Sequence, residues 1–204
     1  MEMEQQSQES RFQKQARVGV GLTGSFCTFR CVFDTLENLK LDCPGLELRF
    51  VLSYHAQQLH NRFSPPEDTC ARIGELTAHE PIMTITAAEP LGPGNLLDLF
   101  VIAPCTGNTL AKLANGVTDT PVLMAAKSHL RNGKPLLIFF SSNDGLGLNL
   151  KNIGMLLGVK NIFFVPFGQD APHQKPNSLV AKAEFLPAAM QAALEGKQLQ
   201  PLLV

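Results

Sequence analysis

A run of small polar residues between Pro104 and Thr109 is the part of this sequence best suited to bind a ligand. Thr106, Asn108 and Thr109 carry hydrogen-bonding side chains, and they follow an apolar stretch, Leu99–Ala103. A helical pattern begins directly after them, so their backbone N–H groups would lie at a helix N-terminus, where anions bind. Ligands of open α/β sheets bind at the carboxyl ends of the strands. We therefore expect this segment to line a cofactor or substrate pocket.

A second candidate is the glycine-rich turn that follows the first apolar run. Residues 19–24, GVGLTG, fit the G-x-G-x-x-G pattern of dinucleotide sites, which also need an acid at the end of the next strand. The end of that strand instead reads Val51-Leu52-Ser53-Tyr54, with no acid. A serine hydroxyl can donate to a phosphate, so Ser53 and residues 21–25 suit a mononucleotide better. The alternative is that Gly21 and Gly24 only permit a tight turn between strand and helix.

The spacing of apolar residues predicts the elements that position these loops. Apolar runs predict strands at 17–22, 46–52, 81–87, 99–103, 135–140 and 162–166. The helical period predicts helices at 28–40, 68–78, 108–115, 118–131, 149–157 and 178–196, and the fourth of these would open at Thr118 or Asp119. Alternation of the two predicts a three-layer α/β fold, Rossmann-like or flavodoxin-like, with a parallel sheet covered on both faces. We expect residues 1–16 to be a mobile lead-in and 17–204 to be one domain.

Composition excludes several classes of function. The net charge of −1 gives no basic field for nucleic acid. No apolar run reaches the roughly 18 residues of a membrane span, and the first residues lack the apolar core of an export signal. We therefore expect a cytoplasmic protein whose five cysteines are reduced thiols. The cysteines and histidines show no metal-ligand spacing, so no metal is predicted.

The two loops resemble motifs of a known family. GLTGS at 21–25 and PCTGNT at 104–109 are similar to the G-x-T-G-S turn and the P-A-S-A-N-T loop of the flavoprotein family that includes the flavin-containing cysteine decarboxylases. The resemblance covers nearly all of residues 17–204, and it implies FMN as cofactor. The implied phosphate ligands are Thr23, Gly24, Ser25 and Ser53. The residues implied to flank the flavin ring or ribityl chain are Pro104, Thr106, Asn108 and Thr109.

Longer phrases resemble one branch of that family. They include TDTPVLMAAKSHLRN, SSNDGLGLN and VPFGQDAPHQKPNSLVAKAE. Members of this branch are the B component of a two-component oxidoreductase of sporulating bacteria. The resemblance implies an A subunit with an NAD(P)-type fold and a trimer-based homo-oligomer in the cytoplasm of the mother cell. It also implies a dicarboxylate substrate: a dihydropyridine from the lysine pathway that the enzyme aromatises.

The loop after the fifth predicted strand departs from the decarboxylase pattern. The decarboxylases carry P-x-M-N-x-x-M-W there, whereas this chain reads Ser141-Ser142-Asn143, and only Asn143 matches. The missing Met and Trp argue against a stand-alone FMN-dependent decarboxylase. We expect Ser142 and Asn143 to bind the substrate. Lys127, with His129 and Arg131 on the same predicted helix, either meets the dicarboxylate or belongs to a solvated helix face.

Two further features leave alternatives open. Phe26 stands where the related sequences carry histidine, so it either weakens flavin binding or packs under the turn. If flavin is not needed, the chain could be a non-catalytic partner that stabilises the A subunit. The polar loop at 168–177, with Gln169, Asp170, His173 and Lys175, could be a lid or a subunit contact.

Overall fold

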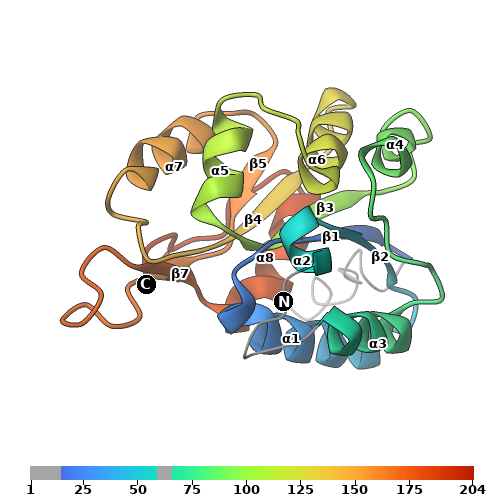
Figure 1. Ribbon diagram of the computed structural model, residues 1–204, viewed down its shortest axis with the longest axis horizontal. Coiled ribbons are helices and arrows are strands. Elements are labelled where there is room, and N and C mark those ends of the chain that lie inside the picture. Colours follow the sequence, from blue (N-terminus) through green and yellow to red (C-terminus); the bar gives the residue numbers. More distant parts are fainter. Residues whose placement is uncertain (1–14, 59–65) are drawn as a thin grey trace, which may run out of the picture.

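One mainly parallel sheet runs through the molecule (Figure 1). The computed structural model describes residues 15–58 and 66–204. Within these residues the strands are ordered β2-β1-β3-β4-β7-β6, and β5 pairs with β4. The bounds are β1 Arg17–Leu22, β2 Glu47–Leu52, β3 Leu99–Cys105, β4 Leu136–Ser142, β5 Ile162–Phe164, β6 Phe167–Gly168 and β7 Leu179–Ala181. Strands β1 to β5 pair in parallel, while β7 runs antiparallel to β4 and β6.

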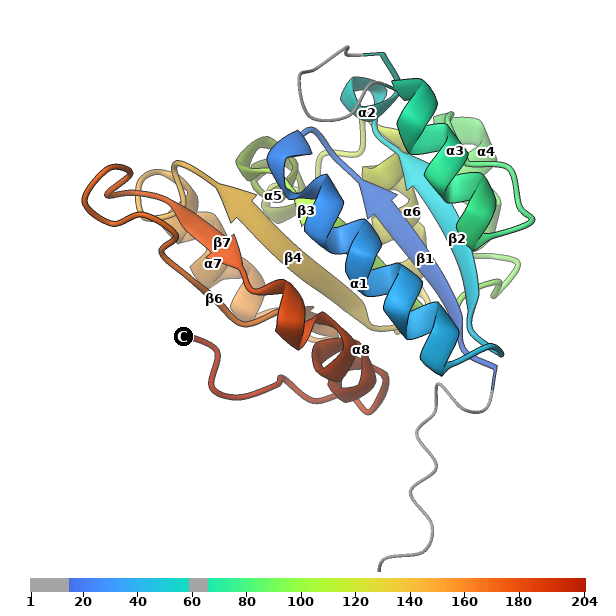
Figure 2. The same ribbon diagram turned by 90° about the horizontal axis from the view of Figure 1, so that it is seen from below.

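Helices cover both faces of this sheet, as Figures 1 and 2 show from two directions. One layer consists of α1 (Phe29–Asp42), α3 (Pro66–Leu76) and α8 (Leu186–Leu194). The other consists of α4 (Ile85–Ala88), α5 (Gly107–Ala114), α6 (Pro121–Arg131) and α7 (Asn149–Leu157). Short helices α2 (Tyr54–Gln58), η2 (Phe26–Thr28), η3 (Glu89–Leu91) and η4 (Ala183–Phe185) lie in the connections. The predicted three-layer α/β fold is confirmed.

The helical period of α1 explains how that layer is attached. The apolar residues that repeat at this period are buried: Phe29, Val32, Phe33, Leu36 and Leu39. The Phe33 ring stacks on Phe50 of β2, with centroids 5.9 Å apart. Arg72 of α3 also lies over the Phe33 ring, 4.8 Å from its centroid. Burial of each such phenyl ring stabilises the fold by roughly 2–3 kcal/mol, so this stack fixes α1 and α3 on the sheet.

Two predicted elements are wrong. Residues 81–87 form no strand: Ile82 makes a single bridge to Val51, and the helix α4 begins because the Thr84 hydroxyl accepts a hydrogen bond from the N–H of Ala87. The predicted helix at 178–196 begins only at Leu186. The residues before it form β7, whose buried–intermediate–buried pattern is that of a strand against a core.

The end of β3 and the start of α6 also differ from the prediction. Strand β3 continues past Ala103 through Pro104 to Cys105, and all of its residues are buried. Helix α6 opens at Thr120, whose hydroxyl accepts from the N–H of Leu123, and not at Thr118 or Asp119. Most of the predicted lead-in at 1–16 lies outside the described residues. Among the described helices, none has the length and apolar character needed to cross a membrane.

Candidate functional site

The turn after β1 is hydrogen-bonded to the ends of two other strands. The Thr23 hydroxyl donates to the carbonyl of Pro104 at 2.7 Å and accepts from the N–H of Thr106 at 3.0 Å. The Ser25 hydroxyl donates to the carbonyl of Ser141 at 2.9 Å. Since β1, β3 and β4 run in parallel, these contacts bring three carboxyl-end loops together. The structure thus places most of the residues predicted from the two motifs at one edge of the sheet.

The first two glycines of the G-x-G-x-x-G pattern serve the packing of β1. A Cβ on Gly19 would lie 2.5 Å from the Phe100 ring, and one on Gly21 would lie 2.9 Å from Val122. The space at both positions is therefore filled by neighbouring side chains. Gly24 is different, because its Cβ would come no nearer than 3.6 Å to another side chain, that of His55. Only this last glycine belongs to the turn at the edge.

Ser53 lies beside that turn, at the end of β2. Its N–H donates to the carbonyl of Leu22 at 3.0 Å, and its hydroxyl accepts weakly from the N–H of Ala56 at 3.4 Å. The serine is buried, and its hydroxyl proton remains available for a further acceptor. His55 is exposed, yet its Cβ faces Gly24. No spacing in the sequence points to His55, because its nearness to the turn depends on the pairing of β1 with β2.

The start of α5 supplies the second group of donors. The Thr106 hydroxyl accepts from the N–H of Thr109 at 3.1 Å and donates to the Thr109 hydroxyl at 3.0 Å. The N–H groups of Gly107 and Asn108 have no partner within the helix, as in any first turn. Asn108 is exposed, so its amide can meet a ligand. Pro104 follows a cis peptide bond and is buried in β3.

These donors fit a mononucleotide flavin such as FMN. The set consists of the Ser53 hydroxyl, the Asn108 amide and the N–H groups of the two loops, and it contains no carboxylate to repel a phosphate. The hydroxyls of Thr23 and Ser25 both give their protons to backbone carbonyls, and their contact with a phosphate stays a prediction. These two side chains hold the loops together. Cys105 is buried, and burial raises the pKa of its thiol, so it offers no reactive thiolate.

The loop after β4 reaches the first residue of α5. A Cβ on Gly107 would lie 2.5 Å from the Asn149 amide nitrogen and 3.0 Å from the Ser142 hydroxyl. The Ser142 hydroxyl also accepts from the N–H of Asp144 at 3.2 Å. Asn143, the other predicted substrate residue, is exposed at the same edge. Sequence reasoning missed Asn149; the only signal was a pair of asparagines three residues apart at the start of a helix.

The basic residues of α6 are not brought to this cluster. His129 is buried, and its Nε2 lies 3.0 Å from the carbonyl of Pro135, at the opposite end of β4. Desolvation lowers the pKa of His129 to about 4. Lys127 is exposed on α6, and Arg131 ends that helix at the same distant edge. A role for Lys127 in substrate binding therefore stays a prediction, and the helix-face alternative fits its position.

Phe26 packs beneath the turn, as the packing alternative predicts. Its ring lies 5.2 Å from that of Phe29, centroid to centroid, and it contacts the hydrophobic core. The aromatic ring therefore has a structural reason to occupy this position.

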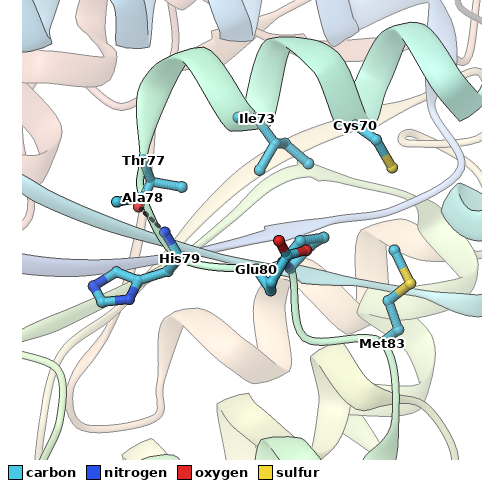
Figure 3. A pocket seen from close by; sticks show the side chains of 9 residues that line it. Cys70, Ile73, Thr77, Ala78, His79, Glu80 and Met83 are labelled. Carbon is cyan, nitrogen blue, oxygen red and sulfur yellow. Dashed lines mark hydrogen bonds between the residues drawn. The ribbon is translucent and has the colours of Figure 1, made fainter.

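A separate cavity of about 370 Å³ lies between α3 and residues 79–83 (Figure 3). Cys70 and Met83 face it, while the His79 ring points away from them. The N–H of His79 is held by the Thr77 hydroxyl at 3.2 Å. In the described part of the chain, no three potential ligand residues are placed to hold a metal ion. This cavity lies beside the edge strand β2, and the loops described above do not line it.

Comparison with known proteins assigns the family. The Flavoprotein family profile matches residues 6–183. The B subunit of dipicolinate synthase from Bacillus subtilis is 49% identical over 191 residues, 94% of each chain. The chain belongs to the flavoprotein family, among its dipicolinate synthase B subunits. This placement agrees with the turn and loop motifs.

One solved structure supports the same family, and a more distant one shows the same fold. The crystal structure of the dipicolinate synthase B subunit from Bacillus halodurans is 46% identical, covers 93% of this chain and 96% of its own, and superposes with a TM-score of 0.84. Burkholderia xenovorans DmrB in complex with FMN, described as a cubic protein cage for redox transfer, shares the fold. It is 20% identical, with 89% of this chain and 96% of that chain covered and a TM-score of 0.65.

Proposed function

We propose that this chain binds FMN at the edge formed by the turn after β1 and the start of α5, and that it works as the flavoprotein component of an oxidoreductase. With an A subunit that carries NAD(P), it would oxidise a dihydrodipicolinate-type product of the lysine pathway to dipicolinate during sporulation. The observation that carries this proposal is the hydrogen-bonded junction of three carboxyl-end loops, in a chain 49% identical to a B subunit of dipicolinate synthase.

The neutral donors at this edge would bind the anionic groups. The Ser53 hydroxyl and the N–H groups of the turn, those of Gly24 and Ser25 included, would hold the FMN phosphate. Thr106, Asn108 and Thr109 would flank the flavin, with Pro104 shaping the loop. Bound flavin would supply a two-electron acceptor. Ser142 and Asn143 would donate hydrogen bonds to a substrate carboxylate.

Asp144 is the acidic residue of the substrate loop, but its carboxylate is folded back. A Cβ on Gly147 would clash with its Oδ1, and its Oδ2 accepts from the Asn149 amide. The carboxylate is thus turned toward Gly147 and Asn149. This arrangement reduces the repulsion that a dicarboxylate would meet at Ser142 and Asn143.

We also propose a trimer-based homo-oligomer in the cytoplasm of the mother cell. The Bacillus subtilis relative is a B subunit, which supports a partner A subunit, and the cage described for DmrB supports self-assembly. Exposed apolar side chains gather on and before α7, and surface patches of this kind mark association sites. They are Leu148, Leu150, Met155 and Leu157. All five cysteines are free thiols, which suits a reducing compartment.

Reconstitution with a purified A subunit tests the catalytic part of this proposal. Dipicolinate formation from the product of the preceding lysine-pathway step is measured with both subunits, with and without FMN. The proposal predicts formation that requires this chain and increases with bound FMN. Equal rates with flavin-free protein would favour a non-catalytic partner, and decarboxylation of cysteinyl substrates by this chain alone would favour the decarboxylase alternative.

A further inference from the structure

Amide hydrogen bonds join α7 to the substrate loop, and the central amide packs against the first residue of the flavin loop. Asn149 stands at its centre: its Nδ2 donates to Asp144 Oδ2 at 3.3 Å, and its Oδ1 accepts from Asn152 Nδ2 at 3.1 Å. The same Nδ2 occupies the space where a Cβ of Gly107 would lie. The side chain of Asn149, the first residue of α7, therefore contacts the loop after β4, Asn152 of its own helix and the first residue of α5.

A second asparagine, Asn152, orients the Asn149 amide. Asn152 is 3% exposed, and its Oδ1 has no hydrogen-bond partner among the described residues. A buried unpaired acceptor destabilises a protein, so an apolar residue would serve stability better at this position. The hydrogen bond that Asn152 gives to Asn149 accounts for an asparagine here, because it turns the Asn149 amide nitrogen toward Gly107 and Asp144.

The loop that Asn149 holds is closely packed at two of its glycines. A Cβ on Gly145 would lie 2.5 Å from the Leu179 side chain of β7. The Asp144 carboxylate lies against Gly147 on the other side of the loop. The loop is thus held against β7 at Gly145, and Asn149 is its buried polar contact with the flavin loop.

We infer that Asn149 is a positioning residue for substrate binding, acting through Ser142 and Asn143. This inference rests on the proposed function. Removal of the amide would free the loop to move away from Gly107, so the two predicted substrate residues would lose their fixed relation to the flavin. FMN itself would still meet Ser53, Asn108 and the turn after β1. The expected consequence is weakened dicarboxylate binding with FMN binding preserved.

Two binding equilibria of the purified full chain test this role. FMN binding is followed by its absorption spectrum, and dipicolinate binding is then followed by the change it causes in the bound-flavin spectrum. Asn149→Ala is expected to weaken dipicolinate binding about tenfold and to change the FMN dissociation constant by less than about threefold. Lys151→Ala, an exposed change on the same helix, serves as the matched control and is expected to alter neither.

Each outcome decides between the two proposals. Wild-type protein that binds no FMN overturns the proposed function, and the inference with it. Wild-type protein that binds both ligands, with Asn149→Ala equal to it in dipicolinate affinity, overturns only the inference. Asn149→Ser, which keeps a polar group, is made alongside. If both variants fail to fold by circular dichroism, Asn149 is a structural residue and the positioning role is wrong.

Discussion

At the scale of single residues, Thr23 connects the parts of the site. The family resemblance predicts that it holds a phosphate, which stays a prediction, and its hydroxyl joins the turn after β1 to Pro104 and Thr106. The side chain is 1% exposed, so no water can replace these bonds if the hydroxyl is lost. Thr23 thus acts as a clamp between two loops, and its loss is expected to affect both the stability of the fold and FMN binding.

Thr23→Val keeps the size of the side chain and removes the hydroxyl. It leaves a buried carbonyl and a partly buried N–H without their partner, which is expected to lower the free energy of unfolding by about 1–3 kcal/mol. FMN affinity is expected to fall at least about fivefold, because the two donor loops are no longer held together. Urea unfolding and FMN titration measure these effects.

Thr35→Val is the matched control for this change. Its hydroxyl donates to the carbonyl of Cys31 on the exposed side of α1. Both the free energy of unfolding and FMN affinity are expected to stay near wild type, within about 0.5 kcal/mol for stability. Equal effects of the two substitutions would contradict the clamping role of Thr23.

At the scale of elements, the N-cap of α6 is Thr120, whereas the sequence predicts that the helix opens at Thr118 or Asp119. Thr120→Ala removes a hydroxyl that accepts from the N–H of Leu123, and loss of an N-cap costs about 1 kcal/mol. Thr118→Ala tests the position predicted from the sequence and is expected to cost less than about 0.5 kcal/mol. Thermal unfolding of both variants decides, and a larger loss for Thr118→Ala would show that the helix begins earlier.

The burial of His129 where α6 packs against β4 makes the stability of the fold depend on pH. Burial lowers the pKa of His129 to about 4, below its ordinary value of 6.5. Between these values the unfolded chain binds the proton and the folded chain does not, so stability falls as the pH is lowered from about 6.5 to 4. The full difference is about 3 kcal/mol, from roughly 1.4 kcal/mol per pKa unit.

Urea unfolding at four pH values between about 7.5 and 4.5 measures this dependence, and His129→Leu is the comparison. The variant cannot take up the proton, so its stability is expected to decline less steeply over this range. Parallel stability curves for the two proteins would contradict the assignment to His129.

An element could be predicted where its pattern is local, and could not where it forms only by pairing with distant strands. Helices α1 and α7 and strands β1 and β2 could be predicted because their apolar periods are complete within the segment. Strand β7 could not, since three residues become a strand only by pairing with β4 and β6. Likewise, Asn149 acquires its role only where α7 meets α5, and no spacing in the sequence reports that contact.

At the scale of the whole molecule, the sheet order places the site. The turn after β1 lies between the ends of β2 and β3, and β4 lies beside β3, so all four carboxyl ends contribute to one edge. The two motifs could therefore be placed at this edge from the sequence alone, because the sequence predicts a parallel sheet. The opposite edge carries Pro135 and His129, which explains why the basic end of α6 does not reach the site.

Self-association is the prediction that belongs to this scale. The chain has a mass of 22.2 kDa, and a trimer-based assembly is expected to give a particle of three times that mass or a multiple of it. Size-exclusion chromatography with light scattering measures the mass without reference to shape. A monomer at micromolar concentration would contradict the proposed homo-oligomer and leave the apolar side chains of α7 without an association role.

Binding of FMN by the neutral donor set at this edge is the central claim, and an absorption titration tests it most directly. Purified chain is mixed with increasing FMN, separated from free flavin by gel filtration, and its visible spectrum recorded. We expect a yellow protein with about one flavin per chain and shifted, structured bands, and weaker retention in Thr23→Val than in Thr35→Val. A colourless protein that retains no FMN at any concentration would contradict the claim.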